Sequence, residues 1–417
     1  MNGTVLFLEP KGTILEVVRA AKARGYRVAA IVSDESLLLQ AQFPYRSAVS
    51  LIDETQRIHS WQDHAVIKRI LAQLHAVSPI RGIYSGMDHC AVISASLRKD
   101  YGLPTTDPAA LDLVLDKHRL RKRLCDLGLS QLTTVPGQDA DRWTHWQMKG
   151  AAYFKPVRGF FSAYVKRCNS MDDLRAAHAE WREGNESDPD YVKNYLQSQN
   201  EYHLEEAFDG ELLSVEGFSQ GGNFQALGLL SRILYSKNPI VEMGSCFPYP
   251  HPLEERIIAL VKRAHEELGL SEGPTHTEVI VGSDGRVEII DLNPRFVGAD
   301  VLQSINYAFG ISIEESLLNY AVGAPLNIAP KHRVYSCLQY ILPPAINVFE
   351  SVEFTHTEDI KFSTTFLKPG ARIVSIERQL DYLGCYLTVM PSFASAIERS
   401  RSLRSSVKVN GKYEGVY

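Results

Sequence analysis

Three oxygen-bearing side chains near the centre of the chain have the types and spacing of a site for a divalent cation. Asp284-Gly285 separates two β-branched runs, which predicts a hairpin, and counting outward from this turn places Glu278 opposite Asp291. Two facing carboxylates repel each other unless a positive charge lies between them. Together with the amide oxygen of Asn293 they suit Mg²⁺, which commonly binds with substrate phosphates, and Arg295 adds a planar fork for phosphate or carboxylate.

The same count predicts which face of the hairpin is buried. Val281 would face Glu288, and Val279 would face Ile290. Because side chains alternate along a strand, one face is expected in the core and the other is polar. The expected core face is Val279, Val281, Ile290 and Leu292, and the expected polar face is His276, Glu278, Asp291 and Asn293.

This pair of strands resembles the metal-binding core of the ATP-grasp ligases. In that family an acidic residue and a later acid-x-Asn-x-Arg run hold Mg²⁺, which Mn²⁺ can replace, together with the phosphates of ATP. The resemblance implies that Glu278, Asp291 and Asn293 are the metal ligands, and Asp291 stands where the family usually has glutamate. It also implies that Arg295 steadies an acylphosphate or an oxyanion, or holds the carboxylate of an incoming amino acid.

Two lysines extend the resemblance to the nucleotide. Lys117 lies on a helix expected from Pro108 to about Leu127 and matches the family lysine that reaches the phosphates. Lys155 ends a strand expected at residues 151–156 and matches the Lys-Pro strand of the family. A compact ammonium at a strand end, followed by a loop with free amides, is suited to binding a triphosphate.

The loop after Lys155 corresponds to the family's glycine-rich flap and includes Ser162. Here the flap has only Gly159, and Phe160 and Phe161 occupy positions where small residues are usual. A strand is expected to follow at residues 163–166. The sequence therefore predicts a stiffer and more apolar flap than is typical.

The segment after the next expected strand resembles the family's adenine-binding linker. Glu205 would accept a hydrogen bond from the exocyclic amine of adenine. The backbone that would present one donor and one acceptor to the ring is that of Glu206, Ala207 and Phe208. The ribose-binding glutamate of the family would fall at Leu212, which leaves Glu211 and Glu216 as replacements.

Two further residues match family positions around the transferred phosphate and the amine substrate. Arg232 stands where the family carries a basic residue on the γ-phosphate. Glu242 fits the Glu-x-Gly-His-x-x-Pro stretch of the carboxylate–amine ligases that join free amino acids. Ser245 replaces the histidine of that stretch.

Composition describes an ordinary globular protein. The chain has 417 residues, 45% hydrophobic and 22% charged, with a net charge of −5. This charge gives no electrostatic case for nucleic acid or an acidic membrane, and no apolar run approaches a membrane span. The cysteines are scattered without a C-x-x-C pair, so reduced thiols in a cytoplasmic protein are expected rather than a disulfide scaffold. They are Cys90, Cys125, Cys168, Cys246, Cys337 and Cys385.

The pattern of elements predicts an α/β protein with the ATP-grasp fold. Strands at 4–8, 26–32 and 82–85 alternate with helices at 13–24 and 62–76, which indicates a parallel, Rossmann-like sheet. A long helix is expected at 301–320, and the sequence beyond it favours a β-rich lid. The predicted domains are the Rossmann-like domain at 1–105, the small lobe at 106–209, the large lobe with the metal site at 210–325 and the lid at 326–417.

The resemblance covers roughly residues 1–325 and implies a reaction. ATP would phosphorylate a carboxylate to an acylphosphate, and an amine would attack it to form an amide or peptide bond, with release of ADP and phosphate. The Glu242 stretch and His276-Thr277-Glu278 look most like the L-amino-acid ligases. We therefore expect one amino acid plus a carboxylic acid or second amino acid as substrates, and a homodimer is one expected state. The alternatives are a carboxylase or purine-pathway-type ligase, and a non-catalytic nucleotide-binding module.

Overall fold

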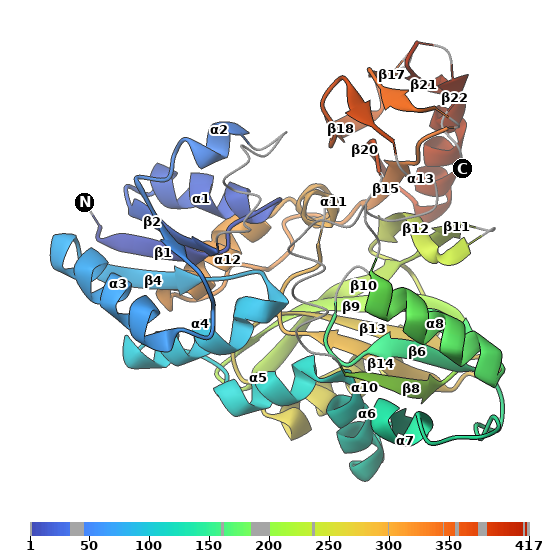
Figure 1. The fold of residues 1–417 in the computed structure, drawn as a ribbon. Coiled ribbons are helices and arrows are strands. Elements are labelled where there is room, and N and C mark those ends of the chain that lie inside the picture. Colours follow the sequence, from blue (N-terminus) through green and yellow to red (C-terminus); the bar gives the residue numbers. More distant parts are fainter. Residues whose placement is uncertain are drawn as a thin grey trace. The chain divides into compact units, whose positions relative to one another are not determined.

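The computed structural model (Figure 1) divides into two compact units. The first consists of Met1–Pro104, Leu227–Glu254 and Phe296–Tyr417, and the second of Thr105–Ala226 and Glu255–Arg295. The four domains expected from the sequence remain a prediction. The structure describes residues 2–33, 46–159, 162–184, 201–235, 238–298, 300–344, 346–354, 358–373, 382–411 and 413–414.

The first unit begins with the predicted parallel sheet. Its strand order is β3-β2-β1-β4, and all three pairings are parallel. The strands are β1 (Thr4–Leu8), β2 (Arg27–Ser33), β3 (Glu54–Ile58) and β4 (Ile80–Tyr84), and the helices between and after them are α1 (Ile14–Ala23), α2 (Arg46–Val49), α3 (His64–Val77) and α4 (Asp88–Asp100). Every residue of β1 is buried, as expected for a strand covered on both faces.

A helix from much later in the chain covers one face of this sheet. A Cβ at Gly82 would lie 2.8 Å from Val322 Cγ1, so the absence of a side chain there allows α12 (Ile313–Val322) to pack closely. The buried guanidinium of Arg98 donates to the backbone oxygens of Tyr320 and Ala321 at the end of the same helix. Hydrogen-bonded carbonyls at a helix end offset the cost of burying this charge.

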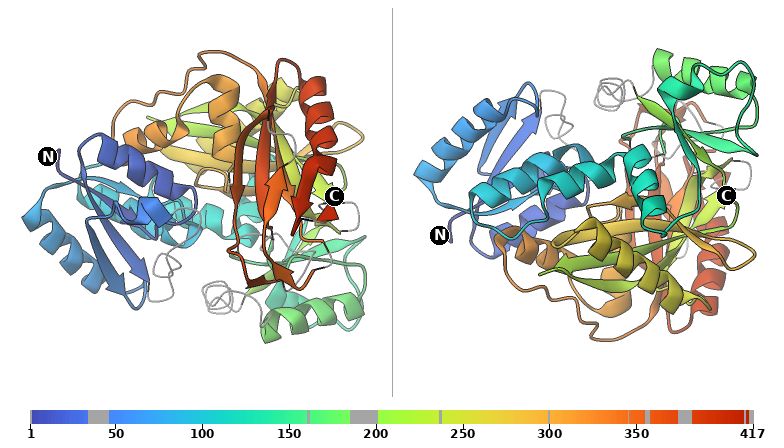
Figure 2. Two further views of the ribbon diagram at one scale, coloured as in Figure 1. Left: turned by 90° about the horizontal axis from the view of Figure 1, so that it is seen from above. Right: turned by 90° about the horizontal axis from the view of Figure 1, so that it is seen from below.

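The rest of the first unit contains a second sheet, in which all four strand pairings are antiparallel. Its order is β11-β12-β15-β20-β18, and α13 (Phe393–Ser402) lies along it, as the left view of Figure 2 shows. The strands are β11 (Ile233–Tyr235), β12 (Asn238–Phe247), β15 (Tyr335–Ile341), β18 (Ile360–Thr365) and β20 (Gly384–Met390). Short strands form two further small sheets, β16-β19 and β17-β21-β22. They are β16 (Val348–Phe349), β17 (Val352–Phe354), β19 (Ala371–Arg372), β21 (Val407–Val409) and β22 (Tyr413–Glu414), and the 3₁₀ turn Leu403–Ser406 precedes β21.

Two cysteines differ from the expectation of reduced thiols. Cys246 of β12 lies directly opposite Cys337 of β15, with 4.2 Å between their Cα atoms, and the two form a disulfide. The other four cysteines are free thiols. The sequence prediction was wrong for this pair because only the strand register brings residues 91 positions apart together. No helix among the described residues is long and apolar enough to cross a membrane.

The second unit contains the two sheets that carry the predicted site. The smaller sheet has the order β5-β8-β6-β7, and the larger has the order β10-β9-β13-β14. The smaller sheet consists of β5 (Thr134–Pro136), β6 (Ala152–Pro156), β7 (Lys166–Cys168) and β8 (Tyr202–Glu206), with α7 (Gly137–Ala140) and α8 (Met171–Glu183) beside it. The larger consists of β9 (Glu211–Gln220), β10 (Asn223–Ser231), β13 (Gly273–Val281) and β14 (Val287–Asn293).

Three expected elements differ from the structure by more than two residues at an end or are divided in two. The helix predicted from Pro108 to Leu127 is two helices, α5 (Pro108–Leu115) and α6 (Lys117–Asp126), because Asp116 leaves the helical conformation and caps α6. The helix predicted at 301–320 is likewise α11 (Val301–Phe309) and α12, separated at Gly310, whose φ is +64°. Glycine ends helices in this left-handed conformation. The strand predicted at 163–166 begins only at Lys166.

In the central hairpin the two acids pair as predicted, but the predicted register is wrong for the residues nearer the turn. Glu278 lies opposite Asp291, whereas Val279 pairs with Ile289 and Val281 with Val287. A β-bulge after Glu278 adds one residue to β14 and reconciles the two registers. The core face therefore includes Ile289 and Val287, and not Ile290 as predicted.

Helix α10 (Glu254–Leu268) packs on the larger sheet through a buried histidine. His265 Nδ1 lies 2.8 Å from the carbonyl oxygen of Val261, and its Nε2 lies 2.9 Å from Thr275 Oγ1. Its ring stacks on Phe224 with 4.2 Å between the centroids. Burial lowers the pKa of His265 from 6.5 to about 4, because a charged imidazole is poorly solvated there.

This histidine predicts how stability depends on pH. Between about pH 6.5 and pH 4 the unfolded chain protonates His265 and the folded chain does not, so the free energy of unfolding should fall as pH falls through this window. In His265→Gln the fall should be smaller. Urea unfolding at several pH values checks this, and parallel curves for the variant and the unchanged protein would contradict it.

Candidate active site

Lys117 and Asp291 form an ion pair at the start of helix α6. The helix begins at Lys117 because the Asp116 carboxylate accepts a hydrogen bond from the backbone N–H of Arg119. Lys117 Nζ lies 2.5 Å from Asp291 Oδ2, and both side chains are largely buried. The positive charge that facing carboxylates require is therefore supplied on the β14 side by Lys117.

Glu278 is paired instead with a histidine of its own strand. His276 Nε2 lies 3.2 Å from Glu278 Oε1, and His276 Nδ1 lies 2.7 Å from Glu216 Oε1 on β9. Glu216 is fully buried and also accepts a hydrogen bond from Ser214. This candidate for the ribose-binding glutamate thus holds His276, so its predicted contact with ribose remains a prediction.

Asn293 and Arg295 end the same face of the hairpin. Asn293 Nδ2 lies 3.5 Å from the carbonyl oxygen of His276, and Asn293 Oδ1 accepts from Arg295 Nη2 at 3.4 Å. The amide oxygen is therefore oriented by a guanidinium and lies on a strand pair that also carries Glu278 and Asp291.

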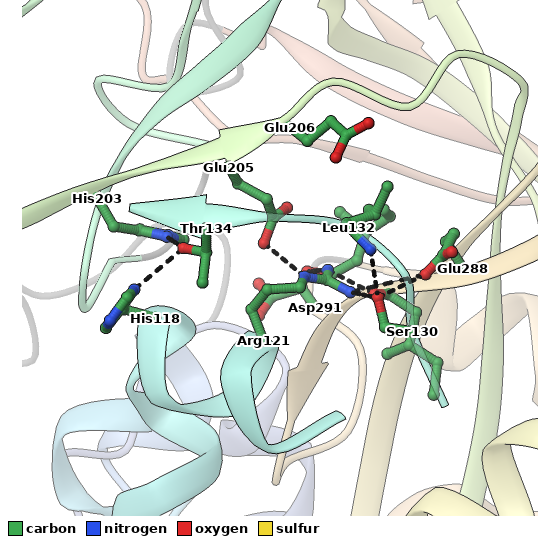
Figure 3. Close-up of polar contacts among 12 residues, drawn as sticks. His118, Arg121, Ser130, Leu132, Thr134, His203, Glu205, Glu206, Glu288 and Asp291 are labelled. Atoms are coloured by element: carbon green, nitrogen blue, oxygen red, sulfur yellow. Dashed lines mark hydrogen bonds and ion pairs between the residues drawn. The ribbon is translucent and has the colours of Figure 1, made fainter. Parts of the chain in front are cut away.

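Lys155 and Glu205 meet on the smaller sheet, although Lys155 pairs with His203 and Glu205 with Tyr153 in the strand register. Lys155 Nζ lies 2.6 Å from Glu205 Oε1. The second carboxylate oxygen of Glu205 accepts from Arg121 Nε at 2.8 Å, a contact drawn in Figure 3. Burial alone would raise the pKa of Glu205, but the charges of Arg121 and Lys155 hold it well below its usual range. Glu205 is thus an ionised carboxylate between two cations.

Arg121 is a site residue that the sequence reasoning missed. Its guanidinium is buried, and beyond Glu205 it donates to Ser130 Oγ at 2.8 Å and to the carbonyl oxygen of Ile289 at 2.6 Å. Ser130 in turn donates to Glu288. The sequence feature that could have identified Arg121 is its position one helical turn after Lys117. It was missed because the basic run that contains it is typical of a solvent-exposed helix face.

Two histidines beside this network were also missed. Thr134 Oγ1 lies 3.0 Å from His118 Nδ1 and 2.9 Å from His203 Nδ1 (Figure 3). Burial lowers the pKa of His203 to about 3, and that of His118 is lowered for the same reason. Both rings are therefore neutral at pH 7. No residue within the described part of the chain bonds His203 Nε2.

The linker after β8 has fewer available backbone groups than predicted. The N–H of Glu206 donates to the carbonyl oxygen of Thr133 and that of Ala207 to the carbonyl oxygen of Ala151, each at 2.9 Å. Among the described residues, no hydrogen bond uses the N–H of Phe208, which leaves it as the donor for a ring. Its side chain lies 4.2 Å from the guanidinium of Arg286.

The flap is described only in part. Ser162 is exposed and has a φ of +50°, and its carbonyl oxygen accepts from the N–H of Val165. Phe160 and Phe161, which the sequence analysis places in the flap, lie outside the described residues. A role for Ser162 in covering phosphates remains a prediction.

Arg232 and Glu242 belong to the first unit, where they form a buried ion pair with each other. The hydroxyl of Tyr382 donates to the backbone oxygen of Glu242. Ser245, at the position where the family has histidine, is buried in β12. The structure therefore brings Arg232 and Glu242 together, and their contacts with a substrate remain predictions.

The donor set on the hairpin fits a hard cation in part. Among the described residues, no group of three or more His, Cys, Asp or Glu side chains is arranged to hold a metal. Glu278, Asp291 and Asn293 offer two carboxylates and an amide oxygen. Mg²⁺ often binds to one or two carboxylates and completes its shell with waters and phosphate oxygens, so this chemistry suits a metal that arrives with a nucleotide.

Comparison with known proteins supports the resemblance to the ATP-grasp family. Residues 151–303 match the family model of the ATP-grasp domain. The L-amino acid ligase of Bacillus licheniformis superimposes with a TM-score of 0.78 at 18% identity, covering 99% of each chain. The phosphoribosylglycinamide synthetase of Anaerococcus prevotii gives 0.69 at 15% identity, covering 99% of this chain and 100% of that one.

Two relatives found by sequence are longer than this chain and match it over part of their length. The uncharacterized protein y4rH of Sinorhizobium fredii is 24% identical over 76% of this chain and 65% of its own length. An alanine–anticapsin ligase of Bacillus amyloliquefaciens is 24% identical over 31% of this chain and 28% of its own length. The chain thus spans less than two thirds of both relatives.

These matches establish the fold. Residues 151–303 match the ATP-grasp domain, and the chain as a whole has the ATP-grasp fold. Within that fold it resembles the L-amino acid ligase of Bacillus licheniformis over nearly its full length. The expected fold class is therefore confirmed.

The Lys155–Glu205 contact generates a direct test. Lys155→Ala should weaken ATP binding about tenfold or more, because a hydrogen bond to a charged group contributes about 1.5–3 kcal/mol. Isothermal titration calorimetry measures this. Lys166→Ala on the same sheet is the control, since that lysine is exposed and pairs with Glu180. Equal Kd values for Lys155→Ala and the unchanged protein would remove Lys155 from the nucleotide site.

Proposed function

We propose that the protein is an ATP- and Mg²⁺-dependent carboxylate–amine ligase that uses an amino acid as at least one substrate. The observation that supports this most is the pairing of both predicted nucleotide-binding lysines with predicted acids inside one compact unit. Lys155 lies on Glu205 of the smaller sheet, and Lys117 lies on Asp291 beside Glu278 of the larger sheet. Such a site can take up a polyphosphate and a metal by exchanging partners.

In this proposal the hairpin holds the metal and the lysines hold the phosphates. Glu278, Asp291 and Asn293 would ligate Mg²⁺, which supplies charge neutralisation of the transferring phosphoryl group. Lys117 now neutralises Asp291. A divalent ion there would do so instead, and the ammonium of Lys117 would then be available for phosphate oxygens.

The reaction needs no nucleophilic side chain. A substrate carboxylate oxygen attacks the γ-phosphorus of ATP, and the bond to the β–γ bridging oxygen breaks to release ADP. The nitrogen of the amine then attacks the acyl carbon, phosphate leaves with the C–O bond electrons, and the nitrogen loses a proton. Lys155 would offset the charge on the phosphates, and Arg295 would stabilise the oxyanion or hold a substrate carboxylate. A role for Arg232 on the γ-phosphate stays a prediction from the family resemblance.

Adenine would lie along the linker after β8. Glu205 would accept from the exocyclic amine, because a carboxylate already bonded to two cations retains acceptor capacity. The carbonyl of Glu206 and the N–H of Phe208 would complete the recognition, since the N–H groups of Glu206 and Ala207 are bonded within the protein.

An amino acid substrate is supported by residue chemistry and by the comparisons. The carboxylate of Glu242 can bind an α-ammonium, and the guanidinium of Arg295 can bind an α-carboxylate in bidentate fashion. Among the similar proteins, an L-amino acid ligase and an alanine–anticapsin ligase both act on amino acids by name.

A carboxylase is the second candidate. The biotin carboxylase domain of the Hydrogenobacter thermophilus 2-oxoglutarate carboxylase, solved with MgADP and bicarbonate, superimposes with a TM-score of 0.72 at 16% identity. Phosphate release that requires bicarbonate and no amine would favour this reading over the amino acid ligase.

The substrate screen tests the proposal directly. ATP, Mg²⁺ and pairs of L-amino acids or small carboxylic acids are incubated with the protein, and phosphate release is measured together with the product mass. We expect release with at least one pair and a product heavier by the joined acyl group. No release above the rate with ATP alone, across amino acids, carboxylic acids and bicarbonate, would contradict a ligase.

Glu278→Gln should abolish turnover and leave the fold intact. The substitution removes the charge of a predicted metal ligand with almost no change in volume, so a loss of at least about a hundredfold is expected from lost metal binding. Glu266→Gln, at an exposed position of α10, is the matched control. Circular dichroism checks the fold, and undiminished phosphate release in Glu278→Gln would refute the assignment.

A further inference from the structure

Helix α6 presents two basic side chains, one turn apart, to both sheets of the second unit. Lys117 and Arg121 are four residues apart and so lie on the same face of the helix. Lys117 reaches Asp291 on β14, and Arg121 reaches Glu205 on β8. A single helical turn therefore touches both the predicted metal strand and the predicted adenine strand, and Figure 3 shows the contact of Arg121 with Glu205.

Each nitrogen of the Arg121 guanidinium has its own acceptor. Nε donates to Glu205 Oε2 at 2.8 Å, Nη1 to Ser130 Oγ at 2.8 Å, and Nη2 to the carbonyl oxygen of Ile289 at 2.6 Å. Nη2 also lies 3.4 Å from the carbonyl oxygen of Ile290. The side chain is 2% exposed, so its planar fork is fixed by these partners and not by solvent.

The carbonyl groups that Arg121 binds are those of the β-bulge. Ile289 pairs with Val279, whereas Asp291 pairs with Glu278, so Ile290 is the extra residue between the two registers. Without this extra residue, Asp291 would turn to the opposite face of the sheet, because a slip of one residue reverses every side chain. The guanidinium thus bonds the part of β14 that sets the direction of the predicted metal ligand.

Arg121 also determines what happens to Glu205 when Lys155 is engaged elsewhere. Lys155 holds one carboxylate oxygen and Arg121 the other. If Lys155 turns to a phosphate, Arg121 remains as the counter-charge, so the buried carboxylate is not left uncompensated. Without Arg121, Lys155 would be the main counter-ion of Glu205. It would then stay bound to Glu205 and be less available to a phosphate.

We propose that Arg121 is a positioning residue that orients Glu205 toward the nucleotide and fixes the β14 bulge so that Asp291 faces Glu278. This inference rests on the proposed function. A purely structural tie between the two sheets would lower stability when removed, but it would leave the affinity for ATP and the dependence on Mg²⁺ unchanged in the folded variant.

The test compares three variants of the full chain. Arg121→Met removes the fork, Arg121→Lys retains the charge without the fork, and Arg119→Met is the matched control on the same helix. Arg119 pairs with Asp112, and their side chains are 49% and 40% exposed. Calorimetry with ATP, first without Mg²⁺ and then over a Mg²⁺ series, is read together with the melting temperature.

We expect Arg121→Met to weaken the ATP Kd about tenfold or more without Mg²⁺ and to raise the Mg²⁺ concentration needed for half-maximal tightening about tenfold. Arg121→Lys should fall between this variant and the unchanged protein in both measurements. Arg119→Met should match the unchanged protein.

If Arg121→Met does not fold, Arg121→Lys decides the question. A folded Arg121 variant with unchanged ATP affinity and unchanged Mg²⁺ dependence overturns the positioning role and leaves the proposed function standing. An unchanged protein that binds no ATP overturns both. The two failures are therefore distinguishable.

Discussion

A carboxylate that is buried and ionised must have a cation beside it, and the second unit is built around this requirement. Glu205 is held between Arg121 and Lys155, and Asp291 is held by Lys117. Removing Lys117 would take this counter-charge from Asp291, whereas Glu205 would keep one of its two cations if the other were removed. The lysines predicted to bind phosphates are thus the same groups that keep the site neutral without a ligand.

Under the proposed function, this pairing makes the binding of nucleotide and metal an exchange of partners. A metal–nucleotide complex brings two positive charges for the acids and several negative charges for the lysines, so every group can find a new partner. The exchange would couple the two ligands, because a cation at Asp291 releases Lys117 for phosphate. Arg121 does not take part in the exchange in this account, since its three acceptors belong to the protein and fix the strands around it.

Much of this arrangement was predictable from local sequence. The Asp284-Gly285 turn indicated a hairpin, and the pairing of Glu278 with Asp291 was confirmed although the residues nearer the turn are shifted by the bulge. Bulges depend on the packing of the strand against its neighbours and have no reliable sequence signal. The break between α5 and α6 had a signal, since Asp116 is a favourable N-cap.

The features that the sequence did not predict all depend on tertiary contacts. Arg121 belongs to a basic run that would be solvated on an isolated helix, and only the two sheets around it make it buried. The neutral histidines at Thr134 depend on strand pairing in the same way. The disulfide between Cys246 and Cys337 joins strands far apart in sequence. The spacing of residues along the chain does not predict these tertiary contacts. It does give the order of the segments that resemble the ATP-grasp family, which is why the fold could be predicted.

The central claim is that Lys117 and Lys155 exchange carboxylates for phosphates when nucleotide and metal bind. A crystal structure with Mg²⁺ and a non-hydrolysable ATP analogue tests this most directly. The account predicts a metal about 2.1 Å from oxygens of Asp291 and Glu278, with Lys117 Nζ moved from Asp291 to a phosphate oxygen. A nucleotide bound away from this hairpin, or a metal that leaves the Lys117–Asp291 pair intact, would contradict it.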